Sequence, residues 1–146
     1  NFRKALSFIE VARSWPFNLG SGKPYQEDID ERLEDWLSYY CLSRLGKPSQ
    51  AKQSLEKILS FSSKTKNGGN KYFSANDLIS AWAIEKLESK EDADRWIDDQ
   101  LSKSSGDKHL SWARNKYYQD NYSMPDSEKD ATIRVIEQWL SFAGNI

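Results

Sequence analysis

The chain has 146 residues, of which 29% are charged and 38% are hydrophobic. This size and composition are typical of one folded domain with a well-solvated surface rather than of a disordered tail. The 21 Lys and Arg residues against 22 Asp and Glu residues give a net charge of −1, so the chain as a whole would not attract nucleic acid or an anionic membrane.

The scarcity of Cys and His and the lack of a long apolar run disfavour metal-binding and membrane-spanning proteins. With a single Cys and a single His, the usual soft metal ligands are nearly missing, and we expect neither a metal site nor a cofactor. No apolar run reaches the length of about eighteen residues that a membrane helix needs. Because the chain does not begin with Met, we expect it to be part of a longer soluble polypeptide, cytoplasmic or periplasmic, with any targeting signal outside it.

The first expected helix covers about residues 1–14 and ends before Trp15 and Pro16. It carries a single apolar stripe at spacings of three and four, which is the pattern of an amphipathic helix. The members of this stripe are Phe2, Ala5, Leu6, Ile9 and Ala12. The following segment, 15–27, holds two Pro and two Gly residues and predicts a long irregular connection.

The clearest unit is a helical hairpin over residues 28–61. Its first helix has one long apolar face, formed by Ile29, Leu33, Trp36, Leu37, Tyr40, Cys41 and Leu45. Gly46 is placed to end this helix, and Pro48 suits the first turn of the next. Ala51 then offers a small side chain where the two helices approach each other, and Leu55 and Ile58 follow as packing positions.

A second, weaker copy of the hairpin is expected at residues 73–104, after a polar loop at 62–72. Ser74 with Asp77, and Ser89 with Asp92, have the spacing of N-terminal capping boxes and predict two helix starts. Two further helices are expected at 108–119 and 127–143, the last of which has Ser127 with Asp130 at its start. Its apolar arc is unusually wide, so it is either well buried or it meets a partner with its outer side.

Residues 40–59 resemble the tetratricopeptide repeat, with Gly46 as the turn glycine and Ala51 as the small residue of the second helix. The pattern differs where Asp35 and Tyr39 replace the first-helix tryptophan and glycine. The string Pro-x-Asn-Leu-Gly-x-Gly-x-Pro at 16–24 further resembles the C-terminal repeat region of large bacterial proteins that carry a glycoside-hydrolase-like domain of unknown function. This resemblance implies a noncatalytic helical module in a carbohydrate-related polypeptide, whose full-length form could itself be a glycoside hydrolase.

The expected fold is therefore all-α, with antiparallel hairpins stacked as a short, right-handed, tetratricopeptide-like solenoid in one domain, 1–146. We expect no β-strand, because no segment alternates convincingly between polar and apolar residues.

Catalytic groupings are weak in this sequence, and we predict no catalytic residue. The segment Gly-Ser-Gly-Lys at 20–23 lacks the strand, spacing and following Ser or Thr of a phosphate loop. Glu31 and Asp35 lie one helical turn apart, but acidic residues are also what a helix start favours. His109 has no second His or nearby Cys, and Cys41 lies on an apolar stripe where a thiol is inert.

Two hypotheses for function follow. In the first, the chain mediates protein–protein or interdomain contacts, binding a protein segment or an upstream domain in a concave groove formed by Trp36, Tyr40, Arg44, Trp82, Glu85 and Lys86. In the second, it binds carbohydrate or assists an enzyme through the exposed rings of Trp112, Tyr117 and Tyr118. We expect no nucleic-acid or membrane partner in either case, and the sequence does not indicate an oligomeric state.

Overall fold

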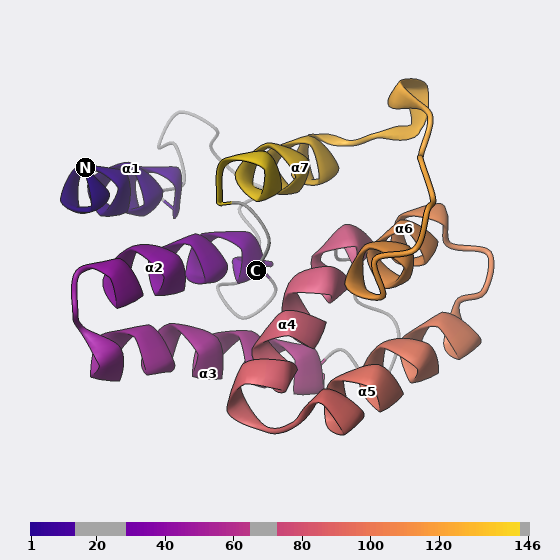
Figure 1. Ribbon diagram of the computed structural model, residues 1–146, viewed down its shortest axis with the longest axis horizontal. Helices are drawn as coiled ribbons and strands as arrows, with labels where there is room; N and C mark the ends of the chain where they lie inside the picture. The colour runs from indigo at the N-terminus through magenta and orange to yellow at the C-terminus, as the bar shows by residue number, and fades with distance from the viewer. Residues whose placement is uncertain (14–28, 65–72, 144–146) are drawn as a thin grey trace, which may run out of the picture. The chain divides into compact units, whose positions relative to one another are not determined.

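A computed structural model describes residues 1–13, 29–64 and 73–143 (Figure 1). Every regular element in these ranges is a helix, which confirms the all-α class for the part of the chain that is described. The chain divides into two compact units, Asn1–Tyr72 and Phe73–Ile146. The prediction of one domain over 1–146 stays a prediction.

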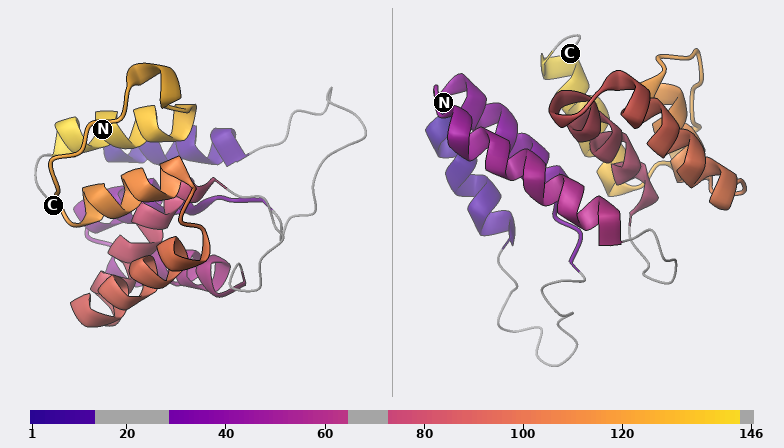
Figure 2. Two further views of the ribbon diagram at one scale, coloured as in Figure 1. Left: turned by 90° about the vertical axis from the view of Figure 1, so that its right-hand side faces the viewer. Right: turned by 90° about the horizontal axis from the view of Figure 1, so that it is seen from below.

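The first unit contains three helices, α1 (Phe2–Arg13), α2 (Arg32–Arg44) and α3 (Pro48–Lys64). The helix in the middle is α2, which packs against α1 on one side and α3 on the other (Figures 1 and 2). Consequently α2 buries side chains on both sides, including the charged residues Arg32 and Asp35. The sequence predicted one apolar stripe on this helix, and that stripe accounts for only some of the residues that α2 buries.

The turn between α2 and α3 agrees with the sequence prediction. Gly46 has φ of 71°, a left-handed conformation that a side chain disfavours. The backbone N–H of Lys47 donates to the carbonyl of Leu42 at 2.9 Å, and that of Gly46 donates to Ser43 at 3.2 Å. These bonds satisfy carbonyls at the end of α2, and α3 begins at Pro48 as expected.

The inner face of α3 follows the predicted small and large positions. Ala51, Leu55 and Ile58 are all buried, and Ile58 has no exposed surface. The small side chain of Ala51 suits the approach of α3 to α2 next to the turn. Burial of this face removes apolar surface from water and is the main stabilising contribution of the pair α2–α3.

The second unit begins with the short 3-10 helix η4 (Ser74–Asn76) and continues with α4 (Asp77–Leu87), α5 (Lys90–Lys103) and α6 (Lys108–Tyr117). It ends with the short η5 (Asp126–Glu128) and with α7 (Ala131–Ala143). Helix α4 contacts both α5 and α6, which also contact each other, and α7 packs on η4. Most of α4 is buried, as its run of small and aliphatic residues requires.

Helix starts in this unit test the predicted capping boxes. The prediction at Ser89 is confirmed, because its Oγ accepts a hydrogen bond from the Asp92 backbone N–H at 3.0 Å. The prediction at Ser74 is wrong, since Ser74 begins the 3-10 turn and α4 starts only at Asp77. For the last helix, Asp130 itself is the cap and accepts from the Ile133 N–H at 2.8 Å, so α7 begins at Ala131 and not at 127.

Other predicted boundaries shift by a few residues. Helix α2 begins at Arg32 rather than at residue 28. The carboxylate of Asp30 accepts a hydrogen bond from the Arg32 backbone N–H at 3.1 Å, at the start of the helix. Helix α3 continues to Lys64, three residues into the predicted loop. The connection 15–27, most of the loop 62–72 and the motif at 16–24 lie outside the described residues. Among the helices that are described, none combines the length and apolar character required to cross a bilayer.

Candidate functional site

The predicted groove residues of the first unit are only partly accessible. Trp36 is 1% exposed, so its predicted exposure on a binding surface is wrong. The centre of its ring lies 5.0 Å from the centre of the Tyr39 ring, on the helix that packs against both α1 and α3. Tyr40 is half-buried and Arg44 is exposed, and the Arg44 guanidinium lies 5.4 Å from the centre of the Tyr40 ring. Tyr40 and Arg44 remain accessible to a partner, whereas Trp36 is a core residue.

The predicted groove residues of the second unit all lie on α4. Glu85 and Lys86 are exposed at its C-terminal end. Trp82 is half-buried, with its ring 5.7 Å from that of Trp139 on α7. This pairing of rings joins α4 to α7 within the unit, so packing uses part of the Trp82 side chain.

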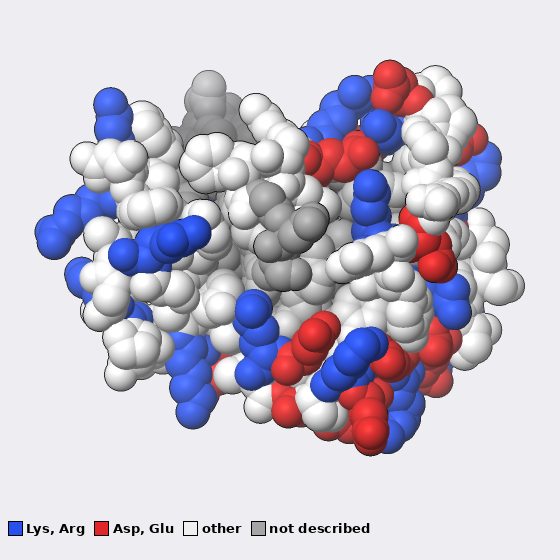
Figure 3. Space-filling view, in the orientation of Figure 1, with Lys and Arg blue, Asp and Glu red and all other residues white. Residues whose placement is uncertain are grey.

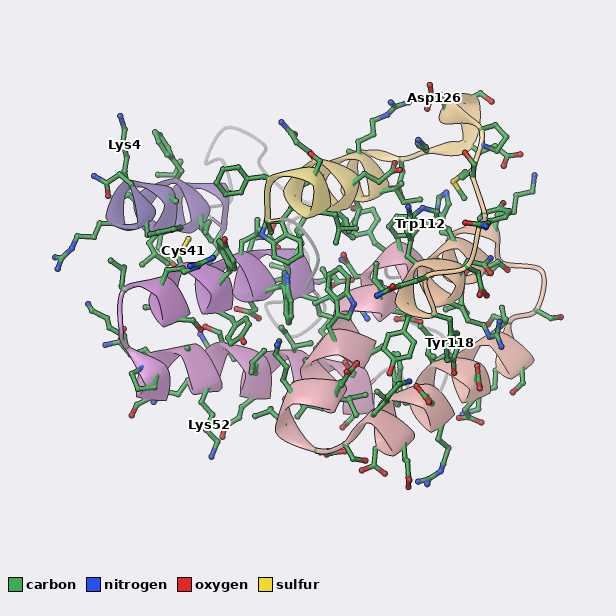
Figure 4. All side chains as sticks on the ribbon, in the orientation of Figure 1. Lys4, Cys41, Lys52, Trp112, Tyr118 and Asp126 are labelled. Carbon is green, nitrogen blue, oxygen red and sulfur yellow. The ribbon has the colours of Figure 1, made fainter. Side chains whose placement is uncertain are left out.

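The predicted carbohydrate-binding rings are not presented to solvent as that hypothesis requires. Trp112 is 1% exposed and Tyr117 is 8% exposed, so both belong to the core. Figure 4 labels Trp112 and Tyr118. Tyr118 is half-buried. Trp112 and Tyr117 lie on α6, which packs toward α4 and α5, and this packing is why they are covered.

The hydroxyl groups of the two tyrosines are used within the protein. Tyr117 donates to Asp94 at 2.8 Å, and Tyr118 donates to Asp98 at 3.1 Å. Burial, reinforced by these hydrogen bonds to carboxylates, raises the pKa of Tyr117 and raises the pKa of Tyr118 to about 12. Both acceptors lie on α5, so the tyrosines that follow one another at the end of α6 join these two helices.

Two cations complete this cluster on α5 and α6. Lys90 pairs with Asp94 at 3.0 Å, and Arg114 pairs with Asp98 at 2.9 Å. Lys90 also lies 5.5 Å from the centre of the Tyr117 ring, within the range of a cation–π contact. Each polar group of the cluster has its partner inside the unit, which is the arrangement of a structural contact.

The only histidine of the sequence also has a structural environment. The Nε2 atom of His109 lies 3.1 Å from the carbonyl oxygen of Glu128, and its Nδ1 atom lies 3.4 Å from Asp130. These contacts join the start of α6 to the segment that precedes α7. Cys41 is buried in the other unit. Burial raises the pKa of its thiol, so less of the reactive thiolate form is present.

The acidic residues near the start of α2 hold α1 in place. The Arg13 guanidinium of α1 lies 2.9 Å from a carboxylate oxygen of Glu31 and 2.9 Å from one of Asp35, and it donates to Ser38 at 3.1 Å. Burial raises the pKa of Asp35, and the charge of Arg13 opposes that shift. Glu31 and Asp35, one turn apart as predicted, thus meet a cation of the chain itself. Within the described ranges no group of three or more His, Cys, Asp or Glu residues is arranged to hold a metal ion.

A surface that the sequence prediction missed lies on α1. Ile9 is buried and α1 packs on α2, but Phe8 and Val11 are 63% and 69% exposed. Lys4 is also exposed, and its Nζ atom lies 6.0 Å from the centre of the Phe8 ring (Figure 4). We call Lys4, Phe8 and Val11 the α1 outer face. The spacing of Phe8 and Val11, three residues apart, was the available signal, since it defines a second apolar side on a helix that needs only one.

Comparison with known proteins adds no relative. No protein-family model matches the chain, and neither the curated proteins nor the solved structures contain a match to it.

Proposed function

We propose that this chain is a noncatalytic helical module that mediates protein–protein or interdomain contacts within a larger polypeptide. The observation that carries the proposal is the α1 outer face, because large apolar side chains adjacent to one another on a helix surface favour a partner that removes them from water. Phe8 and Val11 stay exposed although α1 packs against α2, so the internal packing of α1 does not account for them.

A repeat architecture is part of this proposal. Its support is the α2–α3 pair, with the glycine turn at Gly46 and the buried small residue Ala51 at the positions that the tetratricopeptide-like pattern requires. The contacts of α4 with α5 and of α5 with α6 are those that consecutive helices make in a solenoid. We extend the proposal to a right-handed stack of such hairpins and, on the sequence resemblance, to a bacterial, carbohydrate-related polypeptide.

The noncatalytic role rests on how the reactive side chains are used. His109 contacts Glu128 and Asp130, and Cys41 is buried. The carboxylates at the start of α2 are occupied by the guanidinium of Arg13. Each of these groups thus has a structural explanation.

A carbohydrate-binding role is the alternative, and it is not favoured. Stacking on a sugar requires a ring face that solvent can reach. Trp112 and Tyr117 are buried, so two of the three rings that this alternative needs cannot supply one.

The test measures binding of the chain to the neighbouring portion of its own polypeptide, produced separately, by isothermal titration calorimetry. We expect saturable binding that the double variant Phe8→Ser, Val11→Ser weakens about tenfold or more, since the apolar area that the partner covers is lost. The matched control is Tyr122→Ser, an exposed aromatic residue of the other unit that lies outside its helices and should leave this binding unchanged.

A parallel titration of the chain with oligosaccharides, followed by tryptophan fluorescence, separates the two hypotheses. We expect no saturable change. Saturable quenching by oligosaccharide, together with no calorimetric binding of the neighbouring portion, would contradict the proposed function.

A further inference from the structure

Positive charge is concentrated in two segments of the first unit. Residues 1–9 and 36–50 contain no Asp or Glu, and the cations in these segments are all exposed. They are Arg3, Lys4, Arg44 and Lys47, and we call these four residues the basic patch. Figure 3 shows Lys and Arg side chains without intervening acidic ones around the start of α1.

Contacts between α1 and α2 bring the two segments together. The rings of Phe2 and Tyr40 meet edge to face, with 6.0 Å between their centres. Arg44 lies over the same Tyr40 ring and is 3.4 Å from its hydroxyl oxygen. Arg3 follows Phe2 directly in the sequence, and Lys47 follows in the turn after α2, so the start of α1 and the end of α2, which carry these cations, meet at this pair of rings.

Three carboxylates at the start of α2 are directed to cations outside the basic patch. Glu31 and Asp35 bind Arg13. Asp30 binds the fully buried side chain of Arg32 at 2.9 Å. The negative charge of these three carboxylates is therefore used within the unit.

Two further carboxylates of the first unit also meet cations that lie outside the patch. Glu10 contacts Arg13 at 3.2 Å, and Glu56 lies 4.0 Å from Lys52, one turn away on α3. Glu10 and Glu56 therefore do not neutralise the positive charge of the basic patch.

The basic patch is continuous with the α1 outer face. Lys4 belongs to both, and it lies over the ring of the exposed Phe8.

Charge is also unevenly divided along the sequence. Residues 1–72 contain twelve Lys and Arg against eight Asp and Glu, whereas residues 73–146 contain nine against fourteen. The near-zero net charge of the chain therefore hides a basic unit.

We infer that the basic patch and the α1 outer face together bind an acidic segment of a protein partner, one with apolar side chains that cover Phe8 and Val11. This inference rests on the proposed function and names the chemistry of the partner. The patch supplies four cations, and the outer face supplies apolar area beside them, so a segment with both carboxylates and apolar side chains satisfies both surfaces. A nucleic acid fits less well, since a long polyanion requires an extended cationic surface and the second unit carries an excess of carboxylates.

The probe is a fluorescein-labelled peptide of about 20 residues with Glu and Leu at helical spacing, titrated with the full chain and followed by fluorescence anisotropy. We expect saturable binding that weakens about tenfold when NaCl rises from about 50 to about 300 mM, because exposed charges are screened. The double variant Arg44→Glu, Lys47→Glu should weaken binding about tenfold or more. The matched control is Arg95→Glu, Lys103→Glu, two exposed cations of the second unit, which should leave the affinity unchanged.

Three outcomes would overturn the inference. They are equal binding of a peptide with Lys in place of Glu, unchanged binding by the Arg44→Glu, Lys47→Glu variant, or tighter binding of oligothymidylate than of the acidic peptide. Circular dichroism spectra and urea midpoints identify a variant that has lost its fold, and Lys4→Glu then replaces the double variant. If the neighbouring polypeptide binds wild type and charge-reversed chain equally, the proposed function stands and only the inference about its acidic partner fails.

Discussion

At the residue scale, Gly46 shows a case in which backbone conformation alone decides the amino acid. A Cβ atom at Gly46 would meet no atom within 4 Å, so space is not the constraint. Its φ of 71° lies in the left-handed region, where a side chain costs about 1 kcal/mol. We therefore expect Gly46→Ala to lower the free energy of unfolding by about 1 kcal/mol in urea denaturation.

The matched control for this prediction is Gly106→Ala. A methyl group at Gly106 would also meet open space, but this glycine has no left-handed φ, so its substitution should change the free energy of unfolding by less than about 0.5 kcal/mol. Equal losses in the two variants would show that the turn conformation at Gly46 is not the cause.

Tyr118 leads to a prediction for alkaline pH. Its pKa is raised to about 12 by burial and by the hydrogen bond to Asp98, whereas a tyrosine of an unfolded chain ionises near about 10. The folded protein thus holds this proton more tightly, and the stabilisation is complete below pH about 10 and is lost as the pH rises through about 12.

Ultraviolet absorbance of tyrosinate measures this ionisation. It should show a step near pH 12 that Tyr118→Phe removes and that the exposed-site variant Tyr122→Phe retains. A step near pH 12 that persists in Tyr118→Phe would contradict the assignment.

At the scale of single elements, the attachment of α1 depends on Arg13. Its side chain is 15% exposed and lies between Glu31 and Asp35, a more buried arrangement than that of a surface ion pair. Removal of the cation leaves partly buried carboxylates without their partner, so we expect Arg13→Met to lower the stability of the first unit by about 2 kcal/mol. Hydrogen exchange of α1 amides measures this directly.

The control for Arg13 is Arg95, whose ion pair with Asp92 is exposed on α5. Exposed pairs contribute about 0.5 kcal/mol or less, so Arg95→Ala should leave exchange nearly unchanged. Similar effects of the two substitutions would mean that the ion cluster does not hold α1.

The helices illustrate what local sequence determines. The glycine turn, the start of α3 at Pro48 and the Ser89 cap follow from chemistry within a few residues, and they were predictable. The burial of Trp36 was not, because it depends on α1 and α3 lying on two sides of α2. A helical pattern identifies apolar faces, but it does not tell which neighbour covers them.

The candidate site shows the same limit. The sequence identified Arg44, Glu85 and Lys86 as surface residues, and the structure places them there. It did not identify the α1 outer face, since one apolar stripe was sufficient to explain the helix. The basic patch was also missed, because it unites residues about forty positions apart that only the packing of α1 on α2 brings together.

At the scale of the whole molecule, the two compact units should respond separately to damage of their cores. Ile58 in the first unit and Ile97 in the second are both 0% exposed, and truncation of either to Ala should cost about 2 to 5 kcal/mol. Hydrogen exchange followed by mass spectrometry should show that Ile58→Ala lowers protection of α2 and α3, while Ile97→Ala lowers protection of α4, α5 and α6. Equal loss across all helices in both variants would indicate one cooperative unit instead of two.

Contact with another protein through the exposed side of α1 is tested most directly by a nuclear magnetic resonance titration. The isotope-labelled chain is titrated with the partner that the proposed function names, the neighbouring portion of a larger polypeptide. We expect shift changes centred on Lys4, Phe8 and Val11 and extending to Arg44 and Lys47. Changes confined to the region of Tyr117 and Tyr118, or no changes at saturating concentration, would contradict this contact.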